Sequence, residues 1–436
     1  DVSATTHRCR SAMSASRTPS RPGARFMLDP SLRLPDPMVS NSVGTWAYDT
    51  MKRRIVEEIL IKQVVEANDG LADCAALREL GDQVLSNATL EAIGDGGMDE
   101  AVWNSLLEGY LSTRWRDAPW VLTEFYFYRR VLEAIGYFAG EHGDPFEAQK
   151  ASGLTTSLPA VRSLARMVRA SHCQPPGTPA VDTPEAEAEF KTFLWASLWG
   201  NRMDLSIWPA GEGRDPSSLA RARGAMEQVL GDSRAMLLAD DTAEVWARVR
   251  AEAASGPGRR CDIIADNAGF ELVCDLALAD HLCRLGFQVV VHLKAYPVFV
   301  SDAMRKDVLS HIEALAGDES EEAREMASRW GDLVAQGKME LREHAFWCLP
   351  EPFWEMPEDL VKHFRDSSLV VIKGDANYRR TLGERMWPFS FAFADIASYW
   401  ADVPVCCLRT MKSELCCGVP TGRQKQAERE DESWLV

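Results

Sequence analysis

The stretch Cys261-Asp-Ile-Ile-Ala-Asp-Asn-Ala-Gly-Phe-Glu271 decides the fold of this chain. Its apolar run ends abruptly at Asp266-Asn267, and after Gly269 apolar residues recur at three- and four-residue steps as far as Leu285. This pattern predicts a strand, a tight turn and a helix. The β-branched run 288–293 supplies the next strand, so we expect a β-α-β unit with a right-handed crossover.

Asp266 and Asn267 stand at the carboxyl end of the first strand, which is where parallel α/β sheets bind their ligands. Two oxygen-bearing side chains beside a helix N-terminus suit a hard cation together with a phosphate. Asp and Asn are also ordinary N-cap and turn residues. The pair alone therefore leaves a purely structural role open.

Three further polar clusters follow predicted strands of the same kind. Since the carboxyl ends of parallel strands meet at one edge of a sheet, we expect these clusters to form one site. In chain order they are Ser301-Asp302, Lys373-Gly-Asp-Ala-Asn-Tyr-Arg379 and Arg409-Thr-Met-Lys412.

These segments resemble those of the damage-control phosphatases, and specifically their subfamily III, whose Arg-Thr-x-Lys element corresponds to Arg409–Lys412. The resemblance runs from about Val43 to about Gly418 and includes Leu198–Ser206. It implies a metal-dependent phosphatase of small phosphorylated metabolites, with hexose phosphates such as fructose 1-phosphate and fructose 6-phosphate as substrates. A protein-glutamate O-methyltransferase activity that uses S-adenosylmethionine has been proposed within the same subfamily and is the alternative function.

The expected metal ligands are Asp266, Asn267 and Asp302, which also belong to the expected catalytic set. An all-oxygen ligand set favours Mg²⁺ or Mn²⁺, and the resemblance also admits Co²⁺ and Ni²⁺. Neither His281 nor His292 has the spacing of a convincing ligand. The nucleophile is either a water activated by the metal or a carboxylate such as Asp266, and the sequence leaves both open.

Phosphate hydrolysis also needs cations near the phosphoryl oxygens, and Lys373, as a catalytic residue, and Lys412 are the candidates. Other polar residues are expected around the sugar or the phosphate rim. Glu271 has either a structural role or a sugar contact, and the loop with Asn201 and Asp204 either caps a helix or lies near the site. The full set of expected substrate-binding residues is Asn201, Asp204, Glu271, Asp375, Ala376, Asn377, Tyr378, Arg379 and Lys412.

Two other enzyme classes fit the central stretch less well. A haloacid-dehalogenase-type phosphatase would show Asp-x-Asp after its first strand, whereas Ala268 stands at the third position here. A methyltransferase of the Rossmann type normally carries a glycine-rich turn, and this turn has the single glycine Gly269. A non-enzymatic scaffold would leave the polar strand ends unexplained.

The predicted fold class is α/β. A three-layer α/β/α domain with a mostly parallel sheet should span residues 191–418, behind a helical N-terminal region over 43–190. Residues 1–42 should be a disordered or targeting-like tail, since 2–28 hold arginines but no acidic residue. Residues 419–436 should be a polar C-terminal tail. The aromatics of 346–364 should form either a wall over the pocket or a packed surface cluster.

The net charge of −17 argues against nucleic acid or an anionic membrane as a partner, because both reward basic patches. The 11 cysteines lack metal or redox spacing and indicate reduced thiols, hence a cytoplasmic protein, unless the tail directs it to an organelle. No apolar run is long enough to span a membrane. The expected partner is a small phosphorylated metabolite, and the oligomeric state stays open.

Overall fold

The computed structural model describes residues 4–5, 26–72, 74–172, 181–200, 236–256, 258–431 and 434–435. At its centre lies a sheet with the strand order β2-β1-β7-β6-β3-β4-β5. All neighbours from β7 to β5 run parallel, whereas the short β1 is antiparallel to β7. The strands are β1 Ala4–Thr5, β2 Leu237–Ala239, β3 Arg259–Ile264, β4 Phe287–Lys294, β5 Met339–His344, β6 Leu369–Lys373 and β7 Val405–Thr410.

Both faces of the sheet are covered, which makes the central strands apolar throughout. Successive side chains of a strand point to opposite faces. Ile263 and Val371 accordingly pack with one helix layer, and Ile264 and Ile372 pack with the other. The first layer contains α6 Leu158–His172, α7 Pro184–Trp199, α9 Thr242–Ala254, α10 Phe270–Arg284 and α12 Glu321–Ala335, and α11 Arg305–Ala316 packs beside α12.

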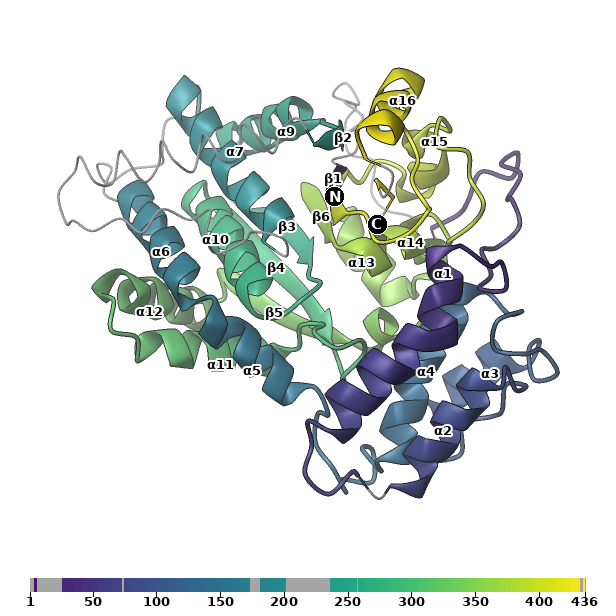
Figure 1. Cartoon of the computed structure of the whole chain (residues 1–436). Helices are drawn as coiled ribbons and strands as arrows, with labels where there is room; N and C mark the ends of the chain where they lie inside the picture. Colours follow the sequence, from purple (N-terminus) through teal and green to yellow (C-terminus); the bar gives the residue numbers. More distant parts are fainter. Residues whose placement is uncertain are drawn as a thin grey trace.

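The opposite face packs against short helices of the C-terminal half and against the N-terminal helices. The C-terminal elements are η3 Ala345–Cys348, η4 Phe353–Glu355, α13 Glu358–Arg365, α14 Asp375–Thr381, α15 Phe393–Ile396 and η5 Ala397–Trp400. The molecule thus has helices on both sides of a mostly parallel sheet. The predicted three-layer α/β/α architecture is confirmed (Figure 1).

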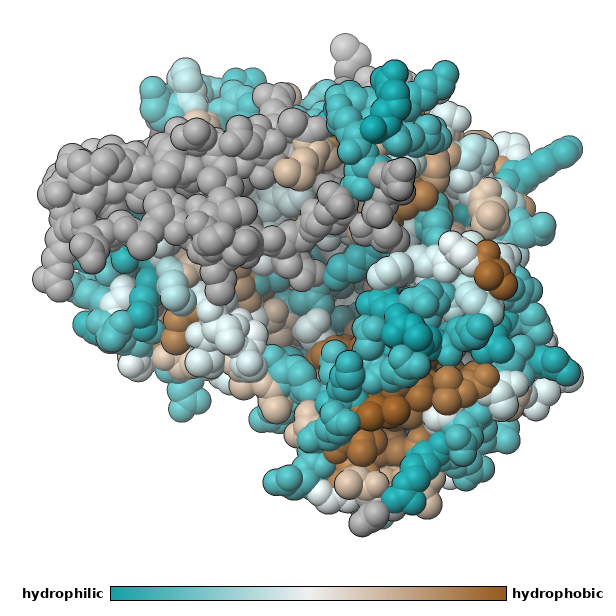
Figure 2. All heavy atoms as spheres, in the orientation of Figure 1, coloured by the Kyte–Doolittle hydropathy of each residue, from teal (hydrophilic) through white to brown (hydrophobic). Residues whose placement is uncertain are grey.

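The N-terminal helices form a lobe beside the sheet (Figure 1). A π-helix, η1, follows α1 directly, and its last turn is closed by a bond from Glu66 N–H to Ile61 C=O at 2.8 Å, the five-residue step typical of π-helices. Figure 2 shows a band of apolar side chains on this lobe. The elements are α1 Trp46–Asp49, η1 Thr50–Val65, α2 Ala75–Leu85, α3 Glu100–Leu107 and α4 Trp120–Ala134, with α5 Glu147–Thr156 leading back to the sheet.

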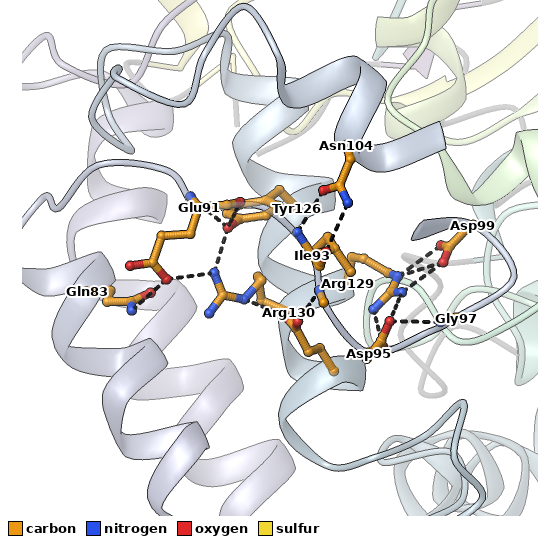
Figure 3. A network of polar contacts seen from close by, with 12 residues as sticks. Gln83, Glu91, Ile93, Asp95, Gly97, Asp99, Asn104, Tyr126, Arg129 and Arg130 are labelled. Carbon is orange, nitrogen blue, oxygen red and sulfur yellow. Dashed lines mark hydrogen bonds and ion pairs between the residues drawn. The ribbon is translucent and has the colours of Figure 1, made fainter. Parts of the chain in front are cut away.

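A buried ionic network holds helix α4 in the lobe (Figure 3). Arg129, whose side chain is 1% exposed, pairs with Asp95 at 2.7 Å and with Asp99 at 2.9 Å. Gly97 is required beside it, because a Cβ atom at that position would meet the Arg129 guanidinium. The network fixes the loop before α3 against α4, and α4 is the helix that carries Glu124 toward the sheet edge.

Three segments differ from the sequence expectation. Part of the expected N-terminal tail is packed, since Phe26 is buried against Tyr399 and Trp400. After Gly418 the chain forms the polar helix α16, Thr421–Glu430. The aromatics of 346–364 form neither a wall over the pocket nor a surface cluster, because Trp347, Phe353 and Trp354 are buried in the core.

Among the described residues, no helix is both long enough and apolar enough to cross a membrane.

Candidate functional site

Backbone pairing brings the three expected metal ligands together. An antiparallel bridge joins Asn267 to Asp302, although 34 residues separate them in the chain. The N–H of Ala303 donates to the carbonyl of Asp266 at 2.7 Å, and the N–H of Ala268 donates to the carbonyl of Ser301 at 2.6 Å. The segment that follows β4 therefore runs back along the turn that follows β3, and the side chains meet at the carboxyl edge of the sheet.

Gly374 allows the third strand end to approach this turn. Its φ of +84° lies in the region that favours glycine. A Cβ atom at this position would overlap the carboxylate of Asp266. The backbone after β6 therefore packs directly against the side chain of Asp266, and the residue type at 374 follows from that approach.

The carboxylates at this edge repel one another. Asp266 is 6% exposed and Asp302 is 2% exposed. Burial, together with the charges of Asp302 and Glu271, raises the pKa of Asp266 well above its usual value, against the opposing charges of Lys412 and Lys294. Burial also raises the pKa of Asp302, although Lys294 lies 3.1 Å away and opposes the shift. The site has more negative charge than its own lysines compensate.

Asn267 lies at the centre of a hydrogen-bond cluster. Its amide nitrogen donates to Asp266 Oδ2 at 2.7 Å and to Glu271 Oε2 at 2.8 Å. Its amide oxygen accepts a bond of 2.6 Å from the hydroxyl of Ser301. The side chains of Asp266, Asn267 and Asp302 all line one cavity. Two carboxylates and one amide oxygen are the donors that a hard divalent cation prefers, so this edge fits such an ion.

The cavity has a volume of about 220 Å³ and lies between the sheet edge and the N-terminal lobe. One wall of it comes from helices α1, η1 and α4, which belong to the helical region that the sequence analysis expected over 43–190. Phe299 closes another side with a strained backbone at φ +53°, held by ring contacts of 4.8 Å with Phe125 and with Tyr128. The residues of the lobe that line it are Trp46, Thr50, Arg54, Ile55, Ile59, Trp120, Glu124 and Tyr128.

Of the segment after β6, Asp375, Ala376 and Arg379 line the cavity. Asp375 pairs with the buried Arg409 at 2.7 Å. Arg379 pairs with Glu124 at 2.6 Å and also with the buried Glu384, and its guanidinium carbon lies 3.9 Å from the centre of the Trp120 ring. These groups are held rigidly before any ligand arrives.

The two lysines expected near the phosphate occupy different places. Lys412 is exposed and lines the cavity, and in the described part of the chain no carboxylate lies within ion-pair distance of its ammonium. Lys373 is 1% exposed and lies outside the cavity, paired with Glu271 at 3.3 Å and with Asp275 at 3.2 Å. The expectation that Lys373 contacts the phosphate is therefore wrong. Lys373 instead holds the carboxylate of Glu271, which accepts a hydrogen bond from the amide of Asn267.

Two other expected substrate contacts are buried beneath the site. The amide nitrogen of Asn377 donates to the carbonyl of Lys373 at 2.9 Å, and the hydroxyl of Tyr378 accepts from the N–H of Cys417 at 3.1 Å. Neither side chain lines the cavity, so both hold the backbone after β6 in place. Asn201 and Asp204 lie outside the described residues.

A second cluster of metal-ligating types lies on β3, β4 and α13. Ligand atoms of Asp262, His292 and His363 lie within 4.8 Å of one another. The sequence analysis missed this cluster because the two histidines are far apart in the chain. Asp262 Oδ1 lies 2.9 Å from Nε2 of His292, and His363 Nε2 approaches the same oxygen.

Hydrogen bonds within the cluster and to two arginines occupy most of its polar atoms, although Nδ1 of His292 is buried without a partner in the described ranges. Arg342 lies 2.6 Å from Nδ1 of His363 and can only donate, so Nδ1 accepts this bond and the Nε2–H group donates to Asp262. Arg260 pairs with the other oxygen of Asp262 at 3.0 Å. The guanidinium of Arg260 already balances the carboxylate, and that of Arg342 occupies Nδ1 of His363, which makes this cluster a poorer cation site than the edge with Asp266.

Comparisons with known proteins agree with the geometry. Residues 48–427 match the family described as the damage-control phosphatase ARMT1-like domain. The chain is 31% identical to the mouse protein named damage-control phosphatase ARMT1 over 377 residues, which is 83% of each chain. It is 29% identical to the human protein of that name over 448 residues, covering 92% of this chain and 96% of the human one.

Among solved structures, a DUF89 family protein from Pyrococcus horikoshii aligns with 80% of this chain and 94% of its own. Its sequence identity is 16% and the TM-score is 0.40, a likeness too distant to place any residue.

Proposed function

The chain belongs to the ARMT1-like damage-control phosphatase family and is a phosphatase, and we propose that it hydrolyses hexose phosphates with the help of a divalent metal ion. Fructose 1-phosphate and fructose 6-phosphate are the substrates we propose. The assignment to subfamily III rests on the Arg409–Lys412 element. The observation that supports the proposal is the meeting of Asp266, Asn267, Asp302 and Lys412 around one cavity.

Asp266, Asn267 and Asp302 would hold the metal, which we propose to be Mn²⁺, Mg²⁺, Co²⁺ or Ni²⁺. Such an ion would neutralise charge on the phosphoryl oxygens and make a water molecule more acidic. Ser301 and Glu271 orient the Asn267 amide from two sides. The excess of buried carboxylate at this edge supports the need for a cation.

Lys412 would place a mobile point charge beside the phosphoryl group, which suits a group whose geometry changes during the reaction. Arg379 and Asp375 would bind sugar hydroxyls, since their positions are already fixed by Glu124 and Arg409. Preorganised polar groups of this kind stabilise the transition state without reorganising during the reaction.

The size of the cavity supports a small substrate. Its volume of about 220 Å³ lies below the range of roughly 300–1,000 Å³ that is usual for drug-sized ligands. The methyltransferase alternative is not favoured. A cavity lined by Asp266, Asp302, Glu124 and Asp375 suits a metal and a sugar better than it suits the cofactor S-adenosylmethionine.

The test is a phosphate-release screen over sugar phosphates with each of the four metals, before and after chelation. We expect chelation to abolish activity and added metal to restore it. Full activity after exhaustive chelation would contradict the metal requirement. S-adenosylmethionine should leave the melting temperature unchanged, whereas Mn²⁺ at 100 times its Kd should stabilise the fold by about 2.7 kcal/mol. The opposite result would favour the methyltransferase.

A further inference from the structure

Arg54 is a cation on the cavity wall that none of the roles above uses. Three basic residues line the cavity in the described part of the chain: Arg54, Arg379 and Lys412. Arg379 is occupied by Glu124 and Glu384, as described above. Lys412 stands beside the expected metal site, where its charge acts on Asp266. Arg54 comes from η1 in the N-terminal lobe, and as far as the structure describes the chain neither the proposed metal site nor a buried ion pair occupies it.

The guanidinium of Arg54 has free donors. Its carbon lies 4.0 Å from the centre of the Trp46 ring, so one face of the plane is stacked. Its Nε donates a long bond of 3.4 Å to Glu58, one turn away on a helix surface. Its two terminal nitrogens have no hydrogen-bond partner among the residues that the structure describes. Two parallel N–H groups on a stacked guanidinium match the oxygens of a carboxylate or a phosphate.

The stack is anchored to the segment that carries Lys412. The N–H of Trp46 donates to Glu414 Oε1 at 2.6 Å, which joins helix α1 to the residues directly after Lys412. Tyr128 lines the same cavity as Arg54 and Asp302. Beyond the effect of burial and of Glu124, its pKa is raised by the charge of Asp302 and lowered by that of Arg54. Arg54 is therefore anchored on the wall that the N-terminal lobe contributes, whereas Asp266, Asn267 and Asp302 line the cavity from the edge of the sheet.

Two of the carboxylates that line the cavity are already paired with arginines other than Arg54. Glu124 and Asp375 are paired with Arg379 and Arg409. Glu58, the one carboxylate bonded to Arg54, is 35% exposed in its side chain, so water screens that pair. The side chain of Arg54 is itself 30% exposed, and a ligand that presents an oxyanion to it would form charge-assisted hydrogen bonds with its free terminal nitrogens.

We propose that, among the sugar phosphates that the site accepts, Arg54 favours those that carry a second anionic group at the end remote from the scissile phosphate. That group is a carboxylate, as in a phosphorylated sugar acid, or a second phosphate, as in a sugar bisphosphate. The proposal rests on the proposed function, because it takes the scissile phosphate to lie at the metal end.

The test compares substrates that differ at the remote end. Glucose 6-phosphate has an uncharged end, 6-phosphogluconate has a carboxylate, and fructose 1,6-bisphosphate has a phosphate. For Arg54→Met we expect kcat/KM to fall roughly 10- to 100-fold with the two anionic-ended substrates, mostly through KM, and to change by less than about threefold with glucose 6-phosphate. Loss with one anionic-ended substrate alone identifies which oxyanion is recognised.

Arg53 offers a matched control. It is the next residue on η1, its side chain is 44% exposed, and it pairs with Asp49, Glu57 and Glu58 on the surface. Arg53→Met should leave both substrate classes unchanged. Arg54→Lys keeps the charge without the planar fork and should recover part of the lost kcat/KM. Equal losses with charged-ended and uncharged-ended substrates, or no loss at all, would overturn the proposal.

Binding separates this proposal from the proposed function. If the wild-type protein releases no phosphate from these compounds, from fructose 1-phosphate or from fructose 6-phosphate, the proposed function fails, and calorimetry of the Mn²⁺-loaded protein still tests Arg54. The wild type should then bind 6-phosphogluconate more tightly than glucose 6-phosphate, and Arg54→Met should remove that difference. Equal affinities of the wild type for the two ligands would refute the role of Arg54.

Discussion

The backbone of Gly374 packs against the carboxylate of Asp266, so closely that a Cβ atom at position 374 would overlap it. We predict that Gly374→Ala displaces Asp266 and weakens Mn²⁺ binding by roughly tenfold or more, the scale seen when the groups that orient metal ligands are removed. The positive φ should separately lower the free energy of unfolding by about 1–3 kcal/mol. Calorimetric titration with Mn²⁺ and urea unfolding measure the two effects.

Gly286 provides the control for this change. Its φ is +93°, and a Cβ atom there would meet nothing within 4 Å. Gly286→Ala should therefore lose stability without losing metal affinity. If both alanine variants bind Mn²⁺ as the wild type does, the contact between Gly374 and Asp266 does not shape the site.

Lys412→Met tests the cation expected beside the phosphoryl group. The change keeps the bulk of the side chain and removes its charge, and the exposed position makes folding insensitive to it. We expect kcat/KM to fall by roughly 10²–10³, the effect of losing one preorganised electrostatic donor. Lys362, which is 63% exposed on α13, serves as the control. A change within about twofold would remove Lys412 from the site.

Lys373→Met should behave in the opposite way. Removal of this buried cation leaves Glu271 and Asp275 without their shared partner. Breaking a buried ion pair in this manner costs about 3–5 kcal/mol. Urea unfolding should show that loss for Lys373→Met and almost none for Lys412→Met. Similar stabilities of the two variants would show that Lys373 does not hold the carboxylates together.

His311 should make the protein sensitive to acid. Its Nε2 accepts the N–H of Gly269 at 2.8 Å, and burial lowers its pKa to about 4. The unfolded chain takes up a proton on this histidine near pH 6.5, and the folded chain does so only near pH 4. Folding stability therefore falls as the pH drops through this window, by roughly 3 kcal/mol in all.

The variant His311→Gln keeps an acceptor for Gly269 and removes the titration. Its free energy of unfolding, measured in urea at several pH values, should fall less steeply between about pH 6.5 and pH 4 than that of the wild type. Parallel curves for the two proteins would exclude His311 as the source of the acid sensitivity.

The sheet and the three proposed metal ligands were accessible from the sequence because they depend on local patterns. Short apolar runs ended in polar residues, and parallel strands place such ends at one edge. The direction in which the Lys373 side chain points could also have been predicted from the sequence. Strand side chains alternate, Val371 packs toward α7 and α10, and Lys373, two residues later, points the same way.

The cavity wall from the N-terminal lobe could not be predicted in this way. Arg54 and Glu124 lie on helices whose apolar residues satisfy the pattern of an ordinary packed face. The part of that face that borders the cavity depends on how the lobe docks onto the sheet edge, which is a long-range relationship. The cluster of Asp262, His292 and His363 was missed for the same reason.

The cavity that joins Trp46 to Lys412 also has a consequence for folding order. Its walls come from nearly the whole length of the chain, so the two ends must meet before the cavity exists. Contacts of such separation form late, because the entropy of closing long loops opposes them. A chain that lacks its last segment would lack Lys412 and the wall that carries it. In refolding from urea, catalytic activity should therefore return after the helical signal.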